Sequence, residues 1–113
     1  AEVDERAEVQ YEKTVEMLRS IDHWISVFVC DATQPNHPLV FANDGFFMMT
    51  GFSKQEIIGT SVLDRLRGRD TNPATEERIV AAMNKSEAIS TCILHYRKDR
   101  SSFWNYLSLQ PVL

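Results

Sequence analysis

The stretch between positions 41 and 59 constrains the fold of this chain most, because it places three structural signals next to one another. Asn43 or Asp44 can cap a short helix whose interior, residues 46–49, is apolar, and Gly51 can end that helix. A predicted strand ends just before it, and a second capped helix follows at once. Elements joined with almost no linker indicate a compact domain of mixed helix and strand.

Two further helices are marked by their first residues. Ser53, with Glu56 three residues later, forms a capping box. Asn72 can cap the other helix, and Pro73 then occupies the first helical position, where a missing N–H removes no hydrogen bond. Between the two helices, residues 60–71 are polar and mixed in charge, and we interpret them as a solvated loop.

Four runs of residues have the composition of strands. Residues 24–30 and 39–41 are rich in β-forming residues and are separated by a loop punctuated with proline. Residues 89–96 and 102–109 alternate in the manner of a pleated strand, and the polar residues 98–101 lie between them. The sequence therefore predicts two adjacent strands near the N-terminal end of the domain and a hairpin near the other end.

The alternation of the hairpin sorts its side chains onto two faces, both of them unusually apolar. One face carries Ile89, Thr91, Ile93, His95, Phe103, Asn105, Leu107 and Leu109. The other carries Cys92, Leu94, Tyr96, Trp104 and Tyr106. A face left open to water would alternate with polar residues, so the second face is expected to be covered by a helix or by a partner subunit.

Residues 1–22 are predicted to form an amphipathic helix that flanks the domain. Apolar residues recur at spacings of three or four and make one stripe. The stripe consists of Val3, Ala7, Tyr11, Thr14, Leu18 and Ile21. Two interpretations stay open: the helix covers its own domain, or it pairs with a second copy of the chain.

With 113 residues, 43% of them hydrophobic, the chain has room for one domain with one core. The formal charge is −4 and no basic cluster is interleaved with aromatic residues, which argues against nucleic acid as a partner. No apolar run approaches the roughly eighteen residues that a membrane span requires, and the acidic N-terminal segment does not resemble a signal peptide. We therefore expect a cytoplasmic domain that binds neither nucleic acid nor membrane.

The reactive residues do not suggest catalysis or metal binding. Cys30 and Cys92 fall in different predicted strands, belong to no C-x-x-C pattern, and are expected to be reduced thiols. The histidines, at positions 23, 37 and 95, lack the spacing of metal ligands. No nucleophile elbow, P-loop, glycine-rich dinucleotide motif or pair of catalytic carboxylates occurs. We therefore expect neither an enzyme nor a metal site.

Residues 31–59 resemble the core of a PAS domain, and within that superfamily the light-oxygen-voltage (LOV) subgroup, without a gap. The resemblance continues through residues 94–96, 103–105 and 109–111. It implies an α+β PAS fold with short helices on one face of a five-stranded antiparallel sheet, in the spatial order second, first, fifth, fourth, third. Only four strands are visible, so we expect a flanking helix over 1–22 and a LOV-like domain over 23–113 that is truncated before its last strand.

The segment that defines LOV photochemistry departs from the family pattern. LOV domains carry a cysteine within a segment of the form G-x-N-C-R-F-L-Q-G, and that cysteine forms an adduct with flavin in light. In residues 59–68 the cysteine position falls on Val62 or Leu63, and neither side chain can supply a thiolate. Cys92 is predicted on the outer sheet face, and Cys30 lies on another strand, so we expect no adduct chemistry.

The residues that would hold flavin mononucleotide (FMN) in a LOV domain are only partly retained. Asn105 keeps one ring-binding amide of the family pattern, but His95 replaces the second and Val80 replaces a phosphate-binding arginine. Unpaired buried groups in such a pocket would each cost about 1–3 kcal/mol. We expect no cofactor, with FMN held without an adduct as the alternative. The candidate cofactor residues are Phe28, Cys30, Leu66, Arg67, His95, Asn105 and Leu107.

The resemblance therefore implies a sensory and regulatory module of a signalling protein, without cysteinyl-flavin photochemistry. Its expected partner is a second copy or another domain of the same protein, met through the flanking helix and the outer sheet face. The candidate interface residues are Val3, Ala7, Tyr11, Leu18, Leu94, Tyr96, Trp104 and Tyr106. Two alternatives stay open: a sensor that binds FMN or another small molecule without an adduct, and a plain dimerisation scaffold.

Overall fold

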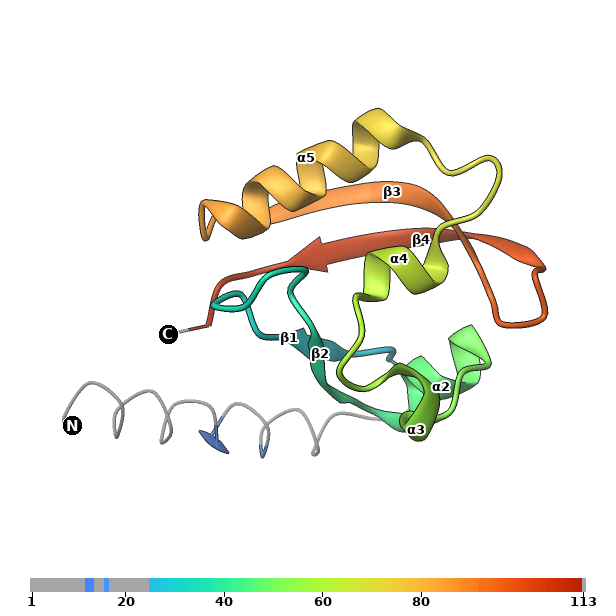
Figure 1. Ribbon diagram of the computed structural model, residues 1–113, viewed down its shortest axis with the longest axis horizontal. Coiled ribbons are helices and arrows are strands. Elements are labelled where there is room, and N and C mark those ends of the chain that lie inside the picture. The colour runs from blue at the N-terminus through green and yellow to red at the C-terminus, as the bar shows by residue number, and fades with distance from the viewer. Residues whose placement is uncertain (1–11, 14–15, 17–24, 113) are drawn as a thin grey trace, which may run out of the picture.

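The computed structural model describes residues 12–13, 16 and 25–112 (Figure 1). Only residues 12–13 and 16 of the expected flanking helix over 1–22 are described, and the residues of its apolar stripe lie outside the described part. The elements, in chain order, are β1 (Phe28–Cys30), β2 (Leu39–Ala42), α2 (Asp44–Thr50), α3 (Lys54–Ile57), α4 (Val62–Leu66), α5 (Pro73–Asn84), β3 (Ile89–Tyr96) and β4 (Ser102–Leu109). The predicted mixed fold of antiparallel strands and short helices is confirmed.

The strands form two antiparallel pairs. β1 pairs with β2, with a register shift between Val29 and Cys30. β3 pairs with β4 along their full lengths, from Ile89 opposite Leu109 to Tyr96 opposite Ser102. Within residues 25–112 no ladder joins the two pairs. In Figure 1, α5 runs along β3, while α2 and α3 lie at the end occupied by β1 and β2.

The capping residues act as the sequence predicts. Asn43 is the N-cap of α2, and its side chain accepts a hydrogen bond from the Phe46 N–H. Gly51 ends α2 in the left-handed conformation, with φ of 77°. Ser53 and Glu56 form both hydrogen bonds of a capping box at the start of α3.

Asn43 also joins α2 to the segment before β1. Its Oδ1 accepts a second hydrogen bond, from the Val27 N–H at 2.9 Å, and its Nδ2 donates to the Ile25 carbonyl at 2.6 Å. We expect Asn43→Ala to lower the free energy of unfolding by about 2 kcal/mol, because one change removes a helix cap and two long-range hydrogen bonds. Urea denaturation measures the loss. Asn72→Ala is the matched control, because the Asn72 side chain caps α5 through a single hydrogen bond, from the Ala74 N–H. This change should lower the free energy of unfolding by about 1 kcal/mol. Equal losses in the two variants would contradict the bridging role of Asn43.

The interpretation of residues 60–71 as a solvated loop is wrong. Residues 62–66 form the helix α4, and the Ser61 side chain caps it by accepting from the Asp64 N–H. Val62 and Leu66, one helical turn apart, are both buried and anchor α4 to the core. The segment therefore contains a packed helix. The charged residues in and around it make the same segment look like a loop in the sequence.

Two apolar clusters form the core. The first consists of Leu39, Phe46, Ile57, Val62 and Leu66. The second consists of Ile79, Ile93 and Leu107. Phe28 packs against both clusters, so β1 lies where they meet. In the described part of the chain no helix is long and apolar enough to cross a membrane.

The outer face of the hairpin is open over part of its length. Trp104 is 74% exposed and Tyr106 is 70% exposed. Their cross-strand neighbours are Leu94 and Cys92. Tyr96 belongs to the same face by alternation but is buried, because the segment around Gly68 packs onto its ring and the Asp70 N–H donates to its hydroxyl. Within the described residues this segment covers that end of the face, where the sequence predicts a helix or a partner subunit. The exposed surface is thus the Trp104–Tyr106 patch, which we define as Cys92, Leu94, Trp104 and Tyr106.

Candidate functional site

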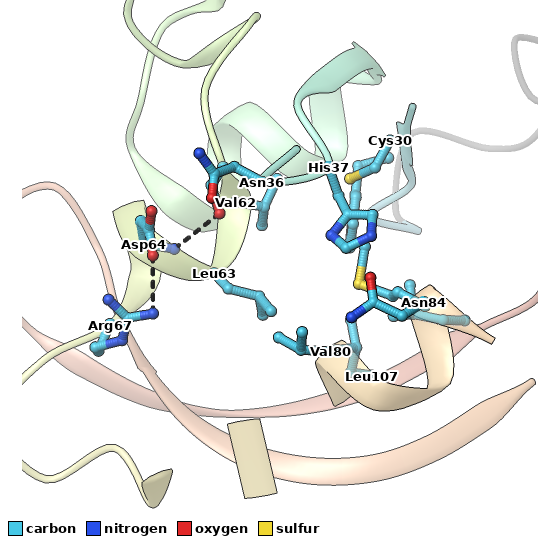
Figure 2. Close-up of a pocket in the computed structure, with 14 residues that line it drawn as sticks. Cys30, Asn36, His37, Val62, Leu63, Asp64, Arg67, Val80, Asn84 and Leu107 are labelled. Carbon is cyan, nitrogen blue, oxygen red and sulfur yellow. Dashed lines mark hydrogen bonds and ion pairs between the residues drawn. The ribbon is translucent and has the colours of Figure 1, made fainter. Parts of the chain in front are cut away.

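A cavity of about 280 Å³ lies among α4, α5, β1 and β4 (Figure 2). Its lining combines an apolar middle with polar groups at the two sides. The lining residues are Phe28, Cys30, Asn36, His37, Ser61, Val62, Leu63, Asp64, Arg67, Val80, Met83, Asn84, Leu107 and Leu109. Figure 2 shows His37 and Asn84 on one side and Asp64 and Arg67 on the other, with Leu63 and Val80 between them.

Aliphatic and thiol side chains meet in this cavity. Val62 and Leu63, at the start of α4, both line it. Cys30, at the end of β1, lines it as well, and burial raises the pKa of its thiol to about 12. Cys30 is therefore a neutral thiol at neutral pH, which makes it a poor nucleophile. Cys92 lies on the outer face of β3, away from the cavity lining.

The guanidinium of Arg67 pairs with two carboxylates at the edge of the cavity. Its Nε donates to both carboxylate oxygens of Glu76, at 2.9 and 2.7 Å, and its Nη2 donates to Asp64 Oδ1 at 2.8 Å. These partners, Glu76 first, raise the pKa of Arg67. Glu76 lies in the first turn of α5, so the ion pairs tie the end of α4 to the start of α5.

His95 and Asn105 form a separate polar pair inside the hairpin. They occupy the same face of β3 and β4, and Asn105 Nδ2 lies 3.1 Å from His95 Nδ1. If the amide donates, His95 Nδ1 accepts, and the neutral ring then carries its proton on Nε2. His95 is 1% exposed and its Nε2 has no hydrogen-bond partner among the described residues. Burial lowers the pKa of His95 to about 4.

A family profile described as "PAS domain" matches residues 25–113 of the chain. The chain belongs to the PAS domain family. It is also similar to the solved LOV domain of the blue-light-activated histidine kinase EL346 from Erythrobacter litoralis, with 33% identity, a TM-score of 0.75, and coverage of 78% of this chain and 80% of that one. This similarity places the PAS domain with the sensory LOV group.

Relatives of this PAS domain are photoreceptors of several kinds. Phototropin-2 of Oryza sativa subsp. japonica is 39% identical over 84 residues, which is 74% of this chain and 9% of that protein. A blue-light photoreceptor of Listeria innocua is 34% identical over 88 residues, 78% of this chain and 34% of that protein. A cysteine-to-valine variant of the fungal photoreceptor Vivid shares the fold, with 22% identity, a TM-score of 0.73, and coverage of 82% and 69%. The PAS domain thus spans 9% of the length of the phototropin and 34% of the length of the Listeria photoreceptor.

The candidate cofactor residues of the PAS domain divide into two groups. Phe28, Cys30, Arg67 and Leu107 line the cavity. Leu66, His95 and Asn105 do not: Leu66 belongs to the first core cluster, and the other two bond to each other. The residues are therefore not brought together as one site.

Sequence reasoning missed two amides of the cavity, Asn36 and Asn84. Asn36 is in a turn with φ of 66°, and Asn84 is the last residue of α5. Turn and helix-end propensities explain both asparagines in the sequence, so no signal distinguished them as lining residues. Only the packing of the β1–β2 loop near the end of α5 brings both amides to one cavity.

Among the residues that line the cavity, no cation is left unpaired for the phosphate of FMN. The arginine that could hold a phosphate is neutralised by two carboxylates, and Asp64 lines the same cavity. The expected ring-binding pair, His95 and Asn105, lies outside the cavity lining. Among the described residues no group of three or more His, Cys, Asp or Glu side chains could hold a metal ion.

Proposed function

We propose that this sensory PAS domain works as an interaction module that associates with a second copy of itself through the Trp104–Tyr106 patch, without cysteinyl-flavin chemistry. One observation carries the proposal: two large aromatic side chains stand beside each other on β4, each more than two thirds exposed. Buried tryptophan and tyrosine dominate the binding energy of many interfaces. A second copy offers the same apolar patch and can cover this one symmetrically.

The proposed lack of adduct chemistry is supported by the side chains of the cavity. Val62 and Leu63 stand where the LOV resemblance implies the reactive cysteine, and both are aliphatic. Cys30 is held as a neutral thiol by burial, and Cys92 faces away. Covering or uncovering the patch would then transmit a signal mechanically, by changing how the sheet packs against an attached element.

We expect Trp104→Lys with Tyr106→Lys to raise the dimer dissociation constant about thirtyfold or more, because the change removes two aromatic anchors and places like charges across the interface. Sedimentation equilibrium over a range of concentrations measures the constant. Met48→Lys is the matched control, because Met48 is an apolar residue of α2 that is 78% exposed and does not belong to the patch, so its change should leave the constant unchanged.

Three results would count against the proposal. A wild-type chain that stays monomeric shows that the patch does not bind a second copy. An unchanged constant in the folded double variant shows that the dimer forms elsewhere. A blue-light-induced shift of the dimer constant in a flavin-loaded chain, abolished by Cys30→Ala, shows that Cys30 supplies the chemistry after all.

A second candidate function is favoured by the cavity itself. A ligand-binding sensor needs an internal site, and the cavity provides one with an apolar middle and polar sides. In that function the PAS domain holds a flavin or another small molecule without an adduct and responds to occupancy or redox state. Retention of a coloured ligand through purification supports this candidate, and failure to bind any added flavin counts against it.

A further inference from the structure

The charges at the cavity assign a chemical class to its occupant; this step rests on the second proposed function, that the cavity binds a ligand. We infer that the cavity selects an uncharged aromatic heterocycle and discriminates against the phosphorylated form of the same ring. Riboflavin and FMN are suitable probes, because they share one ring and side chain and differ by a phosphate group.

The electrostatic part of the inference comes from Arg67. Among the lining residues only Asp64 and Arg67 are charged, if histidine is taken as neutral. Arg67 already binds Asp64 and Glu76, so the three side chains together carry a net charge of −1. A phosphate would have to displace a carboxylate from Arg67 or lie beside one, and like charges at close range repel. The cavity therefore lacks an unpaired cation for an anionic ligand.

The uncharged polar groups of the cavity suit a neutral ring. Asn36, His37 and Asn84 line the cavity, and their side chains make no hydrogen bond with any other residue in the range 25–112. Amides and imidazole offer both donors and acceptors without a fixed charge. Such groups match the edge of a heterocycle that carries both carbonyl oxygens and ring N–H groups.

The size and lining of the cavity agree with this class. Phe28, Leu63 and Leu107 provide apolar walls for a flat ring. The volume of about 280 Å³ is close to the lower limit of roughly 300 Å³ that is usual for small-molecule sites. Riboflavin fits this space more readily than FMN, which adds a phosphate group to the same ring and side chain.

The test is a titration of the full chain with riboflavin and with FMN, followed by flavin fluorescence. We expect riboflavin to bind about fivefold more tightly than FMN at low salt, from the repulsion of a phosphate by a nearby carboxylate. Raising the ionic strength should narrow this difference, because salt screens exposed charges. Riboflavin binding itself should hardly depend on salt.

The two carboxylates that pair with Arg67 can be replaced by amides of nearly the same shape. Asp64→Asn with Glu76→Gln leaves Arg67 unneutralised, and the preference for riboflavin should disappear or reverse toward FMN. Glu77→Gln is the matched control, since Glu77 is the exposed neighbour of Glu76 on α5 and its change alters the net charge without touching Arg67. Far-UV circular dichroism and urea denaturation of each variant show whether the fold is intact.

The outcomes separate the inference from the proposal on which it rests. FMN binding as tightly as riboflavin in the wild-type chain overturns the inference and leaves the ligand-binding function standing. A preference for riboflavin that persists in the Asp64→Asn, Glu76→Gln variant overturns the role given to these carboxylates. A chain that binds neither flavin overturns both the inference and a flavin-binding function.

Discussion

Lowering the pH from 6.5 to 4.5 is expected to reduce the free energy of unfolding by about 2–3 kcal/mol, through His95 alone. Burial lowers the pKa of this histidine from 6.5 to about 4 in the folded chain. Between these values the unfolded chain binds a proton that the folded chain does not, so stability is complete above pH 6.5 and falls as the pH decreases toward 4. Each pH unit in this window is worth about 1.4 kcal/mol.

The pH range over which stability is lost distinguishes the contribution of His95 from that of the carboxylates. Hydrogen bonds, first that with Lys98, lower the pKa of Glu56 to about 2, and hydrogen bonds with Thr33 lower the pKa of Asp31. Stability from these lowered carboxylates is present above their unfolded values and is lost only at more acidic pH. Urea denaturation at pH 4.5, 5.5 and 6.5 therefore reports mainly on His95.

His95→Asn is the control for this prediction. The amide does not titrate in this range, and its oxygen can still accept a hydrogen bond from Asn105, whose Nδ2 lies beside His95 Nδ1. We expect the stability of the variant to be nearly flat between pH 4.5 and 6.5. A wild-type profile as flat as that of the variant would show that His95 is protonated inside the folded chain at little cost.

Gly68→Ala is expected to lower the free energy of unfolding by about 2–3 kcal/mol, the cost of forcing an extra methyl group into a packed site. A Cβ at position 68 would overlap the ring of Tyr96. The ring is held from two sides, because its hydroxyl accepts from the Asp70 N–H at 3.0 Å and its backbone belongs to the ladder of β3 and β4. The Tyr96 ring and the segment around position 68 therefore cannot move apart without breaking these hydrogen bonds. Thermal unfolding measures the loss of stability.

Two comparisons show whether the clash causes the loss. Gly59→Ala meets no neighbouring atom but sits at φ of 85°, so it should cost only about 1 kcal/mol of backbone strain. Gly68→Ala made in a Tyr96→Leu background should cost much less than in the wild-type chain, since the ring that it overlaps is gone. Equal costs in the two backgrounds would refute the packing argument.

Local signals in the sequence were enough to place most of the elements. The capping hydrogen bonds of Asn43, Ser53 and Asn72 each act within one helical turn, so the local sequence is enough to predict them. The hairpin also follows from local pattern, because the pleat fixes which side chains share a face and a short turn fixes the register that places His95 near Asn105. These local signals also carry the resemblance to the PAS family, because they lie in the sequence itself and need no tertiary contact to be recognised.

Tertiary structure alone decided α4, the burial of Tyr96 and the composition of the cavity. A helix of five residues cannot form from its own propensity, because nucleation is unfavourable, and α4 exists through the burial of Val62 and Leu66. Tyr96 is covered by a segment 26 residues earlier in the chain, and Arg67 pairs with Glu76 across two helices. Sequence pattern reports on neighbours along the chain and on the period of a helix or strand. The groups that meet at the cavity come from separate elements, and only the packing of those elements sets their distances.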